Sequence, residues 1–177
     1  MAFIVKSRSN TDNLSGFLLV YQQCRLSRAG VSNHPQDLLV CVMGWQENIL
    51  TTVEQIHDLI LQTKRIAVLG IKTEAQPGQP SVYVPQYLQN AGFQIVPVPV
   101  YYPQATVIIG EKVYRKLADI PGKIDMVDVF RRSSDVTGHI DDVLAKQPTS
   151  LWLQSGIRND AAAEIFAKAG IKVVQDR

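Results

Sequence analysis

The chain has 177 residues, of which 46% are hydrophobic and 19% are charged, and its formal net charge is +2. This length suits one domain with a substantial core, and the composition excludes an intrinsically disordered chain. The small net charge gives no electrostatic argument for a nucleic-acid partner. No apolar run approaches the roughly 20 residues of a membrane-spanning helix, so we expect neither nucleic-acid nor membrane binding.

The first 44 residues differ from the rest of the chain, because they show no sustained hydrophobic period and are interrupted by glycine and proline. We expect a loosely packed extension over residues 1–44 and a folded domain over residues 45–177. The basic residues and serines of residues 1–34 leave organelle targeting open as an alternative, but their amphipathic pattern is poor, and we expect a cytoplasmic protein. Cys24 and Cys41 lie in the extension, where we expect free thiols and no zinc site.

Beyond the extension, helices and strands are predicted to alternate. An apolar stripe at Ile49, Val53, Ile56 and Ile60 indicates a helix over residues 45–64. Short apolar runs predict strands over residues 65–71, 93–100, 124–130, 150–154 and 171–175. Further helices are expected over residues 81–92, from Ser133 or Ser134 to Lys146, and from Asn159 or Asp160 to Gly170.

This alternation indicates an α/β fold with a doubly wound, Rossmann-like, five-stranded parallel sheet. The right-handed crossover rule favours the strand order 3-2-1-4-5. Asp125 and Asp128 in the third predicted strand indicate that this strand ends, or runs along an edge, near solvent. Between the second and third strands, we expect one helical turn around residues 113–117.

The βαβ unit over residues 65–100 organises the chain. It reads RIAVLGIKTEAQPGQPSVYVPQYLQNAGFQIVPVPV, which is a strand, a turn rich in glycine and proline, a helix and a strand. Ligands of open parallel sheets bind beyond the carboxyl ends of the strands, against the helix N-terminus. The loop from Gly70 to Ser81 occupies that place. Lys72 in this loop, with Arg131 and Arg132 after the third strand, would bring three cations to one edge, which suits a ligand with several phosphates.

Two common nucleotide-binding motifs are absent from this loop. After Gly70 there is no second glycine until Gly78 and no Lys-Ser pair, which excludes a P-loop. A nicotinamide fingerprint would need GxGxxG and an acidic residue at the end of the second strand, and the chain has neither. A diphosphate can still be held by the backbone amides of the loop and by the helix N-terminus.

Several strings of the sequence resemble the small stand-alone coenzyme A-binding domain proteins. They are IAVLG, YVPQYL, VPVPVYY, GEKVYRKLADIPGKIDMVDVFRRSSDV and WLQSGIRNDAAA, and the resemblance covers about residues 48–177. Those proteins are similar in fold to the coenzyme A-binding domain of the succinyl-coenzyme A ligase α subunit. The resemblance therefore implies coenzyme A or an acyl-coenzyme A as a small-molecule ligand.

The resemblance also implies which residues contact coenzyme A. One group would face the diphosphate, a second would flank the nucleotide end, and a third would close the side of the third strand. In that order, the groups are Gly70, Ile71, Lys72, Ser81, Val82 and Tyr83; Pro97, Val98 and Tyr102; and Phe130, Arg131 and Arg132.

The histidines give no sign of a catalytic site. His34, His57 and His139 are isolated, no serine–histidine–acid arrangement stands out, and His139 is expected to be a solvated helix residue. We therefore expect a protein that binds coenzyme A without catalysis of its own. Two alternatives stay open: an NAD(P)-dependent oxidoreductase-like enzyme on the same fold, and a regulatory or scaffold module with a vestigial nucleotide pocket.

Overall fold

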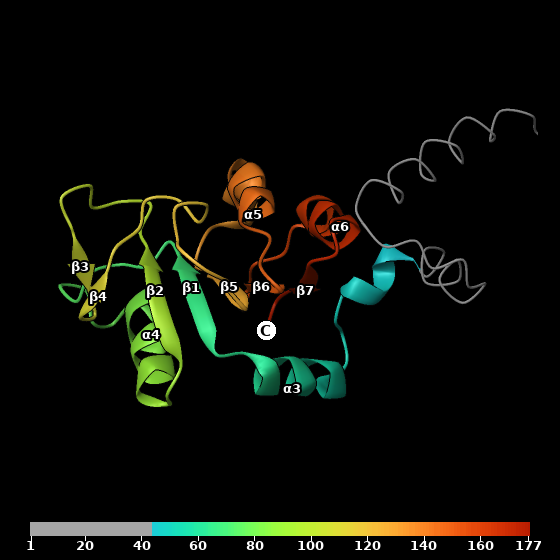
Figure 1. Cartoon of the computed structure of the whole chain (residues 1–177), viewed down its shortest axis with the longest axis horizontal. Coiled ribbons are helices and arrows are strands. Elements are labelled where there is room, and N and C mark those ends of the chain that lie inside the picture. The colour runs from blue at the N-terminus through green and yellow to red at the C-terminus, as the bar shows by residue number, and fades with distance from the viewer. Residues whose placement is uncertain (1–43) are drawn as a thin grey trace, which may run out of the picture. The chain divides into compact units, whose positions relative to one another are not determined.

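The computed structural model describes residues 44–177, and the structural statements below concern this part of the chain. The chain divides into two units, Met1–Gly44 and Trp45–Arg177. The predictions for residues 1–43, including the two free thiols, lie outside the described residues. In the second unit, a five-stranded parallel sheet has helices on both faces (Figure 1), which confirms the predicted α/β, Rossmann-like class. Among the described residues, no helix has the length and apolar character needed to span a membrane.

The elements follow the predicted alternation, with one additional hairpin. The strands are β1 (Arg65–Leu69), β2 (Gln94–Val98), β3 (Val107–Ile108), β4 (Glu111–Lys112), β5 (Met126–Val129), β6 (Ser150–Leu153) and β7 (Lys172–Val174). The α-helices are α3 (Val53–Gln62), α4 (Pro80–Asn90), α5 (Ile140–Lys146) and α6 (Asp160–Lys168). Two 3-10 helices are η1 (Trp45–Asn48) and η2 (Ser133–His139).

The predicted strand order is wrong. The order in the sheet is β2-β1-β5-β6-β7, which is 2-1-3-4-5 for the five predicted strands. The reason lies in the connection between β2 and β5, because it buries Leu117, Ile120 and Ile124 on the sheet face opposite α4. A right-handed crossover on that face must carry the chain back across β1. β5 therefore pairs with β1, and the topological switch point lies between these two strands.

Each strand of the sheet contributes alternate side chains to two separate core clusters. On one face, Ala67 and Leu69 of β1 pack with residues of α5 and α6. On the other face, Ile66 and Val68 pack with residues of α3 and α4 (Figure 1). Because both faces are covered, the carboxyl edge of the sheet is the place where loops from several strands meet.

β5 is a central strand, so the prediction that its aspartates mark a solvent edge is wrong for Asp128. This residue is 2% exposed, and β5 pairs with β1 on one side and with β6 on the other. The side-chain amide of Gln154 donates a hydrogen bond to the Asp128 carboxyl group at 2.6 Å. Burial raises the pKa of Asp128 to about 7, although this hydrogen bond acts in the opposite direction.

The helix predicted over residues 45–64 begins later than expected. The side chain of Thr52 accepts a hydrogen bond from the Gln55 N–H, and the side chain of Gln55 accepts one from the Thr52 N–H. This reciprocal pair is a capping box, which stabilises the start of α3 at Val53.

The predicted apolar stripe of this helix is wrong in part, because Ile49 and Ile56 pack against the core but Val53 and Ile60 do not. Leu59 is the buried side chain of α3, whereas Val53 is 77% exposed and Ile60 is 39% exposed. The residues before the cap lie along the outer edge of β7, where the Leu50 N–H donates a hydrogen bond to the Val173 carbonyl at 2.8 Å.

The helical turn expected around residues 113–117 is absent, and a hairpin over residues 107–112 precedes this segment. β3 and β4 pair antiparallel around Ile109 and Gly110, which have φ angles of 48° and 77°. Positive φ at both central residues is the geometry of a type I′ turn. The Glu74 carboxylate accepts a hydrogen bond from the Ile109 N–H, and the Gln89 amide donates to the Ile109 carbonyl at 3.2 Å. These contacts hold a β-branched residue in a conformation it rarely adopts.

The segment after β5 also differs from the prediction. η2 comes first, and only its C-terminal continuation, α5, is α-helical. Ser133 does not cap this segment, because its hydroxyl accepts a hydrogen bond from the Arg158 N–H at 3.1 Å. The predicted cap of α6 is confirmed, since the Asn159 side chain accepts from the Ala162 N–H at 3.0 Å.

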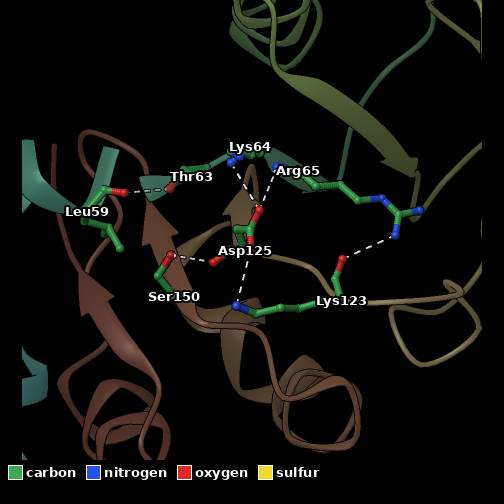
Figure 2. A network of polar contacts seen from close by, with 7 residues as sticks. All are labelled: Leu59, Thr63, Lys64, Arg65, Lys123, Asp125 and Ser150. Carbon is green, nitrogen blue, oxygen red and sulfur yellow. Dashed lines mark hydrogen bonds and ion pairs between the residues drawn. The ribbon is translucent and has the colours of Figure 1, made fainter. Parts of the chain in front are cut away.

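A polar network around Asp125 joins the amino ends of the strands (Figure 2). Its carboxylate accepts hydrogen bonds from the N–H groups of Lys64 at 3.1 Å and Arg65 at 3.0 Å, and lies 3.6 Å from the Lys123 ammonium group. The Asp125 carbonyl accepts from the Ser150 hydroxyl at 2.9 Å. One residue thereby connects the beginnings of β1, β5 and β6.

Two further cations support the turn that precedes β5. The Arg65 guanidinium donates to the carbonyl groups of Pro121 at 2.6 Å and Lys123 at 3.3 Å. The Lys146 ammonium group donates to the Gly122 carbonyl at 2.7 Å. Burial, together with the nearby Arg65 charge, lowers the pKa of Lys146. Arg65 and Lys146 thus bind backbone carbonyl groups of the protein itself.

Candidate ligand-binding site

At Gly70, next to the switch point, the ends of three strands come together. Gly70 has a φ of +89°, and a Cβ atom there would lie 2.5 Å from the Phe130 carbonyl oxygen and 3.0 Å from Cδ of Arg131. The position therefore requires glycine both for its conformation and for the close approach of β5. The Gly70 N–H donates to the Val98 carbonyl at 2.9 Å, and the Phe130 N–H donates to the Leu69 carbonyl at 2.8 Å.

The loop after Gly70 leads into the N-terminus of α4. The Lys72 N–H donates to the Ser81 carbonyl at 3.3 Å, and the Lys72 ammonium group lies 3.3 Å from the side-chain oxygen of Gln79. Gln79 is the N-cap of α4, but its side chain makes no capping hydrogen bond, and Pro80 is the first helical residue. The N–H groups of Val82 and Tyr83 donate to the Gln79 carbonyl at 2.9 and 3.1 Å, which leaves the Ser81 N–H without a backbone partner in the described part of the chain. The helix dipole favours an anion near this N–H group.

Arg131 extends inward at the same edge. Its side chain is 12% exposed, forms an ion pair with Asp135 at 2.9 Å, and lies 5.4 Å from the centre of the Tyr101 ring. Its Nε atom is buried and has no hydrogen-bond partner within residues 44–177. Arg132, in contrast, is exposed, and its side chain makes no hydrogen bond or ion pair with a described residue. Because buried N–H groups are almost always paired, Arg131 carries unused binding capacity at the switch point.

A cavity of about 250 Å³ lies at the carboxyl ends of β1 and β2. Its wall is largely apolar, and its polar side chains come from the connection after β2 and from the beginning of α5. The lining residues are Leu69, Val98, Pro99, Val100, Pro103, Arg115, His139 and Asp142.

Arg115 fixes the rim of this cavity. Its guanidinium donates to the carbonyl groups of Tyr102 at 3.2 Å and Pro103 at 2.8 Å, and also to the carbonyl of Ala105. Tyr102 has a φ of 64°, which is uncommon for a residue other than glycine. Such a strained residue persists where surrounding contacts hold it, and here the Arg115 hydrogen bonds do so.

Asp142 and His139 contribute to the cavity from α5. The two Asp142 oxygens accept hydrogen bonds, at 2.8 and 3.1 Å, from backbone N–H groups of the connection after β2. His139 is only partly exposed, which contradicts the prediction of a solvated helix residue. Burial and the nearby Arg131 charge lower the pKa of His139, although Asp142 and Asp135 act in the opposite direction. The imidazole is therefore neutral at pH 7.

The structure brings together some of the residues predicted to form the site and separates others. Gly70, Val98, Phe130 and Arg131 meet at the switch point, and Lys72 meets Ser81 at the start of α4. The remaining six residues are spread around this centre. Ile71 and Val82 are buried in the core, Pro97 is buried in β2, Tyr83 is 50% exposed on α4, Tyr102 is half-buried next to the lining residue Pro103, and Arg132 is exposed.

The sequence-based prediction missed Tyr101, Arg115, His139 and Asp142. Tyr101 and Arg115 lie within strings that resemble the family, but no pattern in the sequence shows that these four residues come together, because the connection after β2 must first recross β1 and meet α5. The apolar spacing of Leu117, Ile120 and Ile124 is a sequence signal that this connection packs on the sheet, although it does not say on which face. Within residues 44–177, no group of three or more His, Cys, Asp and Glu side chains is placed to hold a metal ion.

Comparison with known proteins identifies the family. The family model described as "CoA binding domain" matches residues 64–177. The chain belongs to the CoA binding domain family. The uncharacterised protein YneT of Bacillus subtilis (strain 168) is 33% identical over 122 residues, which is 69% of this chain and 87% of YneT.

Solved structures share the fold of this chain. A structure from Thermus thermophilus, cell-free ID.343, is 36% identical, covers 72% of this chain and 92% of its own, and has a TM-score of 0.65. Acetyl-coenzyme A synthetase 1 of Ca. Korarchaeum cryptofilum, in complex with phosphate and ADP, is 23% identical, with a TM-score of 0.53. The match covers 62% of this chain and 25% of the synthetase, so it shows a shared fold alone.

Proposed function

We propose that this member of the CoA binding domain family binds coenzyme A or an acyl-coenzyme A at the carboxyl edge of its sheet. The observation that carries the proposal is the buried guanidinium of Arg131, whose Nε is unpaired among the described residues and which lies beside Gly70. A phosphate oxygen supplies the acceptor that this N–H lacks, and arginine suits phosphate in both charge and geometry.

The remaining features of this edge support the same kind of ligand. Gly70 lets a diphosphate approach the backbone closely, and the Ser81 N–H at the start of α4, which has no backbone partner among the described residues, can donate to it. Lys72 adds a second cation at the start of the helix. Coenzyme A carries a diphosphate and a further phosphate, so its charge matches an edge that offers a backbone amide, a lysine and an arginine.

The proposal contains no catalytic step. The carboxylate of the cavity, Asp142, is engaged by backbone N–H groups, and His139 makes no hydrogen bond with a carboxylate that could orient it as a base. We therefore expect acetyl-coenzyme A to be recovered intact after prolonged incubation with the protein. Release of free thiol above the rate in buffer would show a hydrolytic activity and would overturn this part of the proposal.

Thermal unfolding with added ligand tests the proposal directly. Coenzyme A at 100 times its dissociation constant should stabilise the protein by roughly 2.7 kcal/mol, while NAD at the same concentration should have little effect. A stabilisation by NAD that equals or exceeds that by coenzyme A would favour the oxidoreductase-like alternative. No stabilisation by either ligand would favour a vestigial pocket.

A further inference from the structure

The polar side chains of the 250 Å³ cavity differ in how much of their hydrogen-bonding capacity is in use. Arg115 donates to three backbone carbonyl groups, and both oxygens of Asp142 accept from backbone N–H groups. His139 makes no side-chain hydrogen bond with any described residue. It occupies the N-cap position of α5, yet its side chain does not cap the helix. Its imidazole thus remains available on the cavity wall.

The rest of the wall determines what can enter. It consists of Leu69, Val98, Pro99, Val100 and Pro103. Arg115 on the rim already donates to three carbonyl groups, so a phosphate in the cavity would gain little compensation for its lost hydration. The phosphates of a ligand therefore belong outside, next to Gly70 and Arg131. A compact, uncharged part of the same ligand suits the cavity.

A flat heteroaromatic ring fits this description better than a flexible chain. A neutral imidazole has one donor and one acceptor, and a nucleobase offers complementary groups along one rigid edge. A long pantetheine-like arm would lose the freedom of many rotatable bonds on entering a small cavity, whereas a ring loses little.

We propose that His139 determines ligand specificity, because its imidazole forms the hydrogen bond to the heteroaromatic base of a phosphate-bearing nucleotide ligand seated in the cavity. The inference rests on the proposed function, since the phosphates held near Gly70 and Arg131 bring the base to the cavity.

The first test measures the affinity for coenzyme A by calorimetry in His139→Ala, with His57→Ala as the matched control. His57 is on α3, and its side chain is 67% exposed. Loss of one neutral hydrogen bond should weaken binding about three- to tenfold in His139→Ala, and the control should bind as the wild type does. Equal affinities in the wild type and a folded His139→Ala variant overturn this inference but leave the proposed function intact. Failure of the wild type to bind overturns both.

The second test needs no substitution in the protein being measured. The imidazole resonance of His139 in the wild-type protein, assigned from its absence in His139→Asn, is followed by NMR during addition of two fragments of coenzyme A. Adenosine 3′,5′-bisphosphate, which carries the base, should shift this resonance. 4′-Phosphopantetheine, whose phosphate is expected next to Arg131, should shift it less at the same degree of saturation. A shift caused by 4′-phosphopantetheine that equals or exceeds that caused by the adenosine fragment overturns the placement of the base.

Discussion

The two edges of the sheet carry similar charges but use them differently. At the amino edge, Arg65 and Lys146 donate hydrogen bonds to carbonyl groups of the turn before β5. The Asp125 carboxylate accepts hydrogen bonds from two backbone N–H groups (Figure 2). At the carboxyl edge, Arg131 keeps a buried Nε without a partner among the described residues, and Arg132 is exposed. The side chains of Arg65 and Lys146 are thus bound by the protein itself, whereas the Nε of Arg131 is not.

This contrast shows that the number of cations in a region does not identify a binding site. What matters is whether the hydrogen-bonding capacity of those cations is already satisfied, since an unsatisfied buried group gains most from a ligand. Substitution of Arg65 or Asp125 at the amino edge should therefore reduce stability, and substitution of Arg131 at the carboxyl edge should reduce ligand affinity. The following predictions test this division.

The largest expected effect comes from Asp128, whose burial raises its pKa from 3.8 to about 7. At pH values between these two pKa values the folded state keeps the proton of Asp128, so the contribution of this residue to the free energy of unfolding is largest below pH 4 and falls as the pH rises toward 7. At roughly 1.4 kcal/mol per pKa unit, Asp128→Asn should exceed the wild type by up to about 4 kcal/mol at pH 8, and by little at pH 4. Urea unfolding across this pH range measures the difference.

Asp141→Asn, an exposed change on α5, serves as the control for this experiment. It should leave the pH dependence of the wild type unchanged. Parallel stability curves for Asp128→Asn and the wild type would contradict the raised pKa of the buried group.

Gly70→Ala should destabilise the protein by about 3 kcal/mol, because the new Cβ meets a backbone carbonyl oxygen and the backbone is left-handed. Gly156→Ala separates these two causes. Gly156 also has a positive φ, +79°, but a Cβ there meets nothing within 4 Å, so only about 1 kcal/mol of strain is expected. Denaturant unfolding of both variants gives the comparison, and equal losses would show that the approach of β5 to Gly70 contributes nothing.

Asp125→Ala should reduce stability by about 2 kcal/mol, because two backbone N–H groups lose a charged acceptor. Its affinity for coenzyme A should remain that of the wild type, since the network lies at the opposite edge of the sheet. Asp119→Ala is a suitable control, as the Asp119 side chain is exposed and makes no polar contact with a described residue. A loss of affinity in a folded Asp125→Ala variant would contradict the division between the two edges.

Local sequence signals predicted the elements of the fold well but not their arrangement. Gly70 and Asn159 marked the strand end and the helix cap that the structure contains. The strand order depended on which face the connection after β2 covers, and no local pattern states this. The hairpin of residues 107–112 was missed because its turn is Ile-Gly rather than Asn-Gly, and contacts from Glu74 and Gln89 stabilise it.

For the candidate site too, the sequence predicted the residues placed by local signals but not those placed by long-range packing. Gly70 and Arg131 follow apolar strands directly, so the fold class alone was enough to place them at the carboxyl edge. Arg115 and His139 reach the cavity through long-range packing, and His139 looked like an ordinary solvated residue because its neighbours in sequence are polar. The burial of Asp128 was hidden for the same reason, since its environment comes from strands distant in the sequence.

The smallest expected effect is also the most direct comparison of cations at the two edges. Arg131→Ala removes a charged hydrogen bond to phosphate, worth roughly 1.5–3 kcal/mol, and should weaken coenzyme A binding at least about tenfold. Arg132→Ala should change the affinity less than about twofold, because an exposed charge is screened by solvent. Arg65→Ala should lower stability without changing affinity, since its guanidinium binds the carbonyl groups of the turn before β5. Calorimetry with coenzyme A gives all three affinities.

Asp135→Asn completes this set, because it removes the ion pair of Arg131 but keeps the guanidinium. If Arg131 acts on the ligand, Asp135→Asn should bind coenzyme A as tightly as the wild type, or more tightly, since a carboxylate near the phosphates is lost. If Arg131 acts only by fixing η2 through Asp135, both variants should lose affinity to the same extent. Equal losses in Arg131→Ala and Asp135→Asn, or unchanged affinity in a folded Arg131→Ala variant, would show that the unpaired Nε does not serve the ligand.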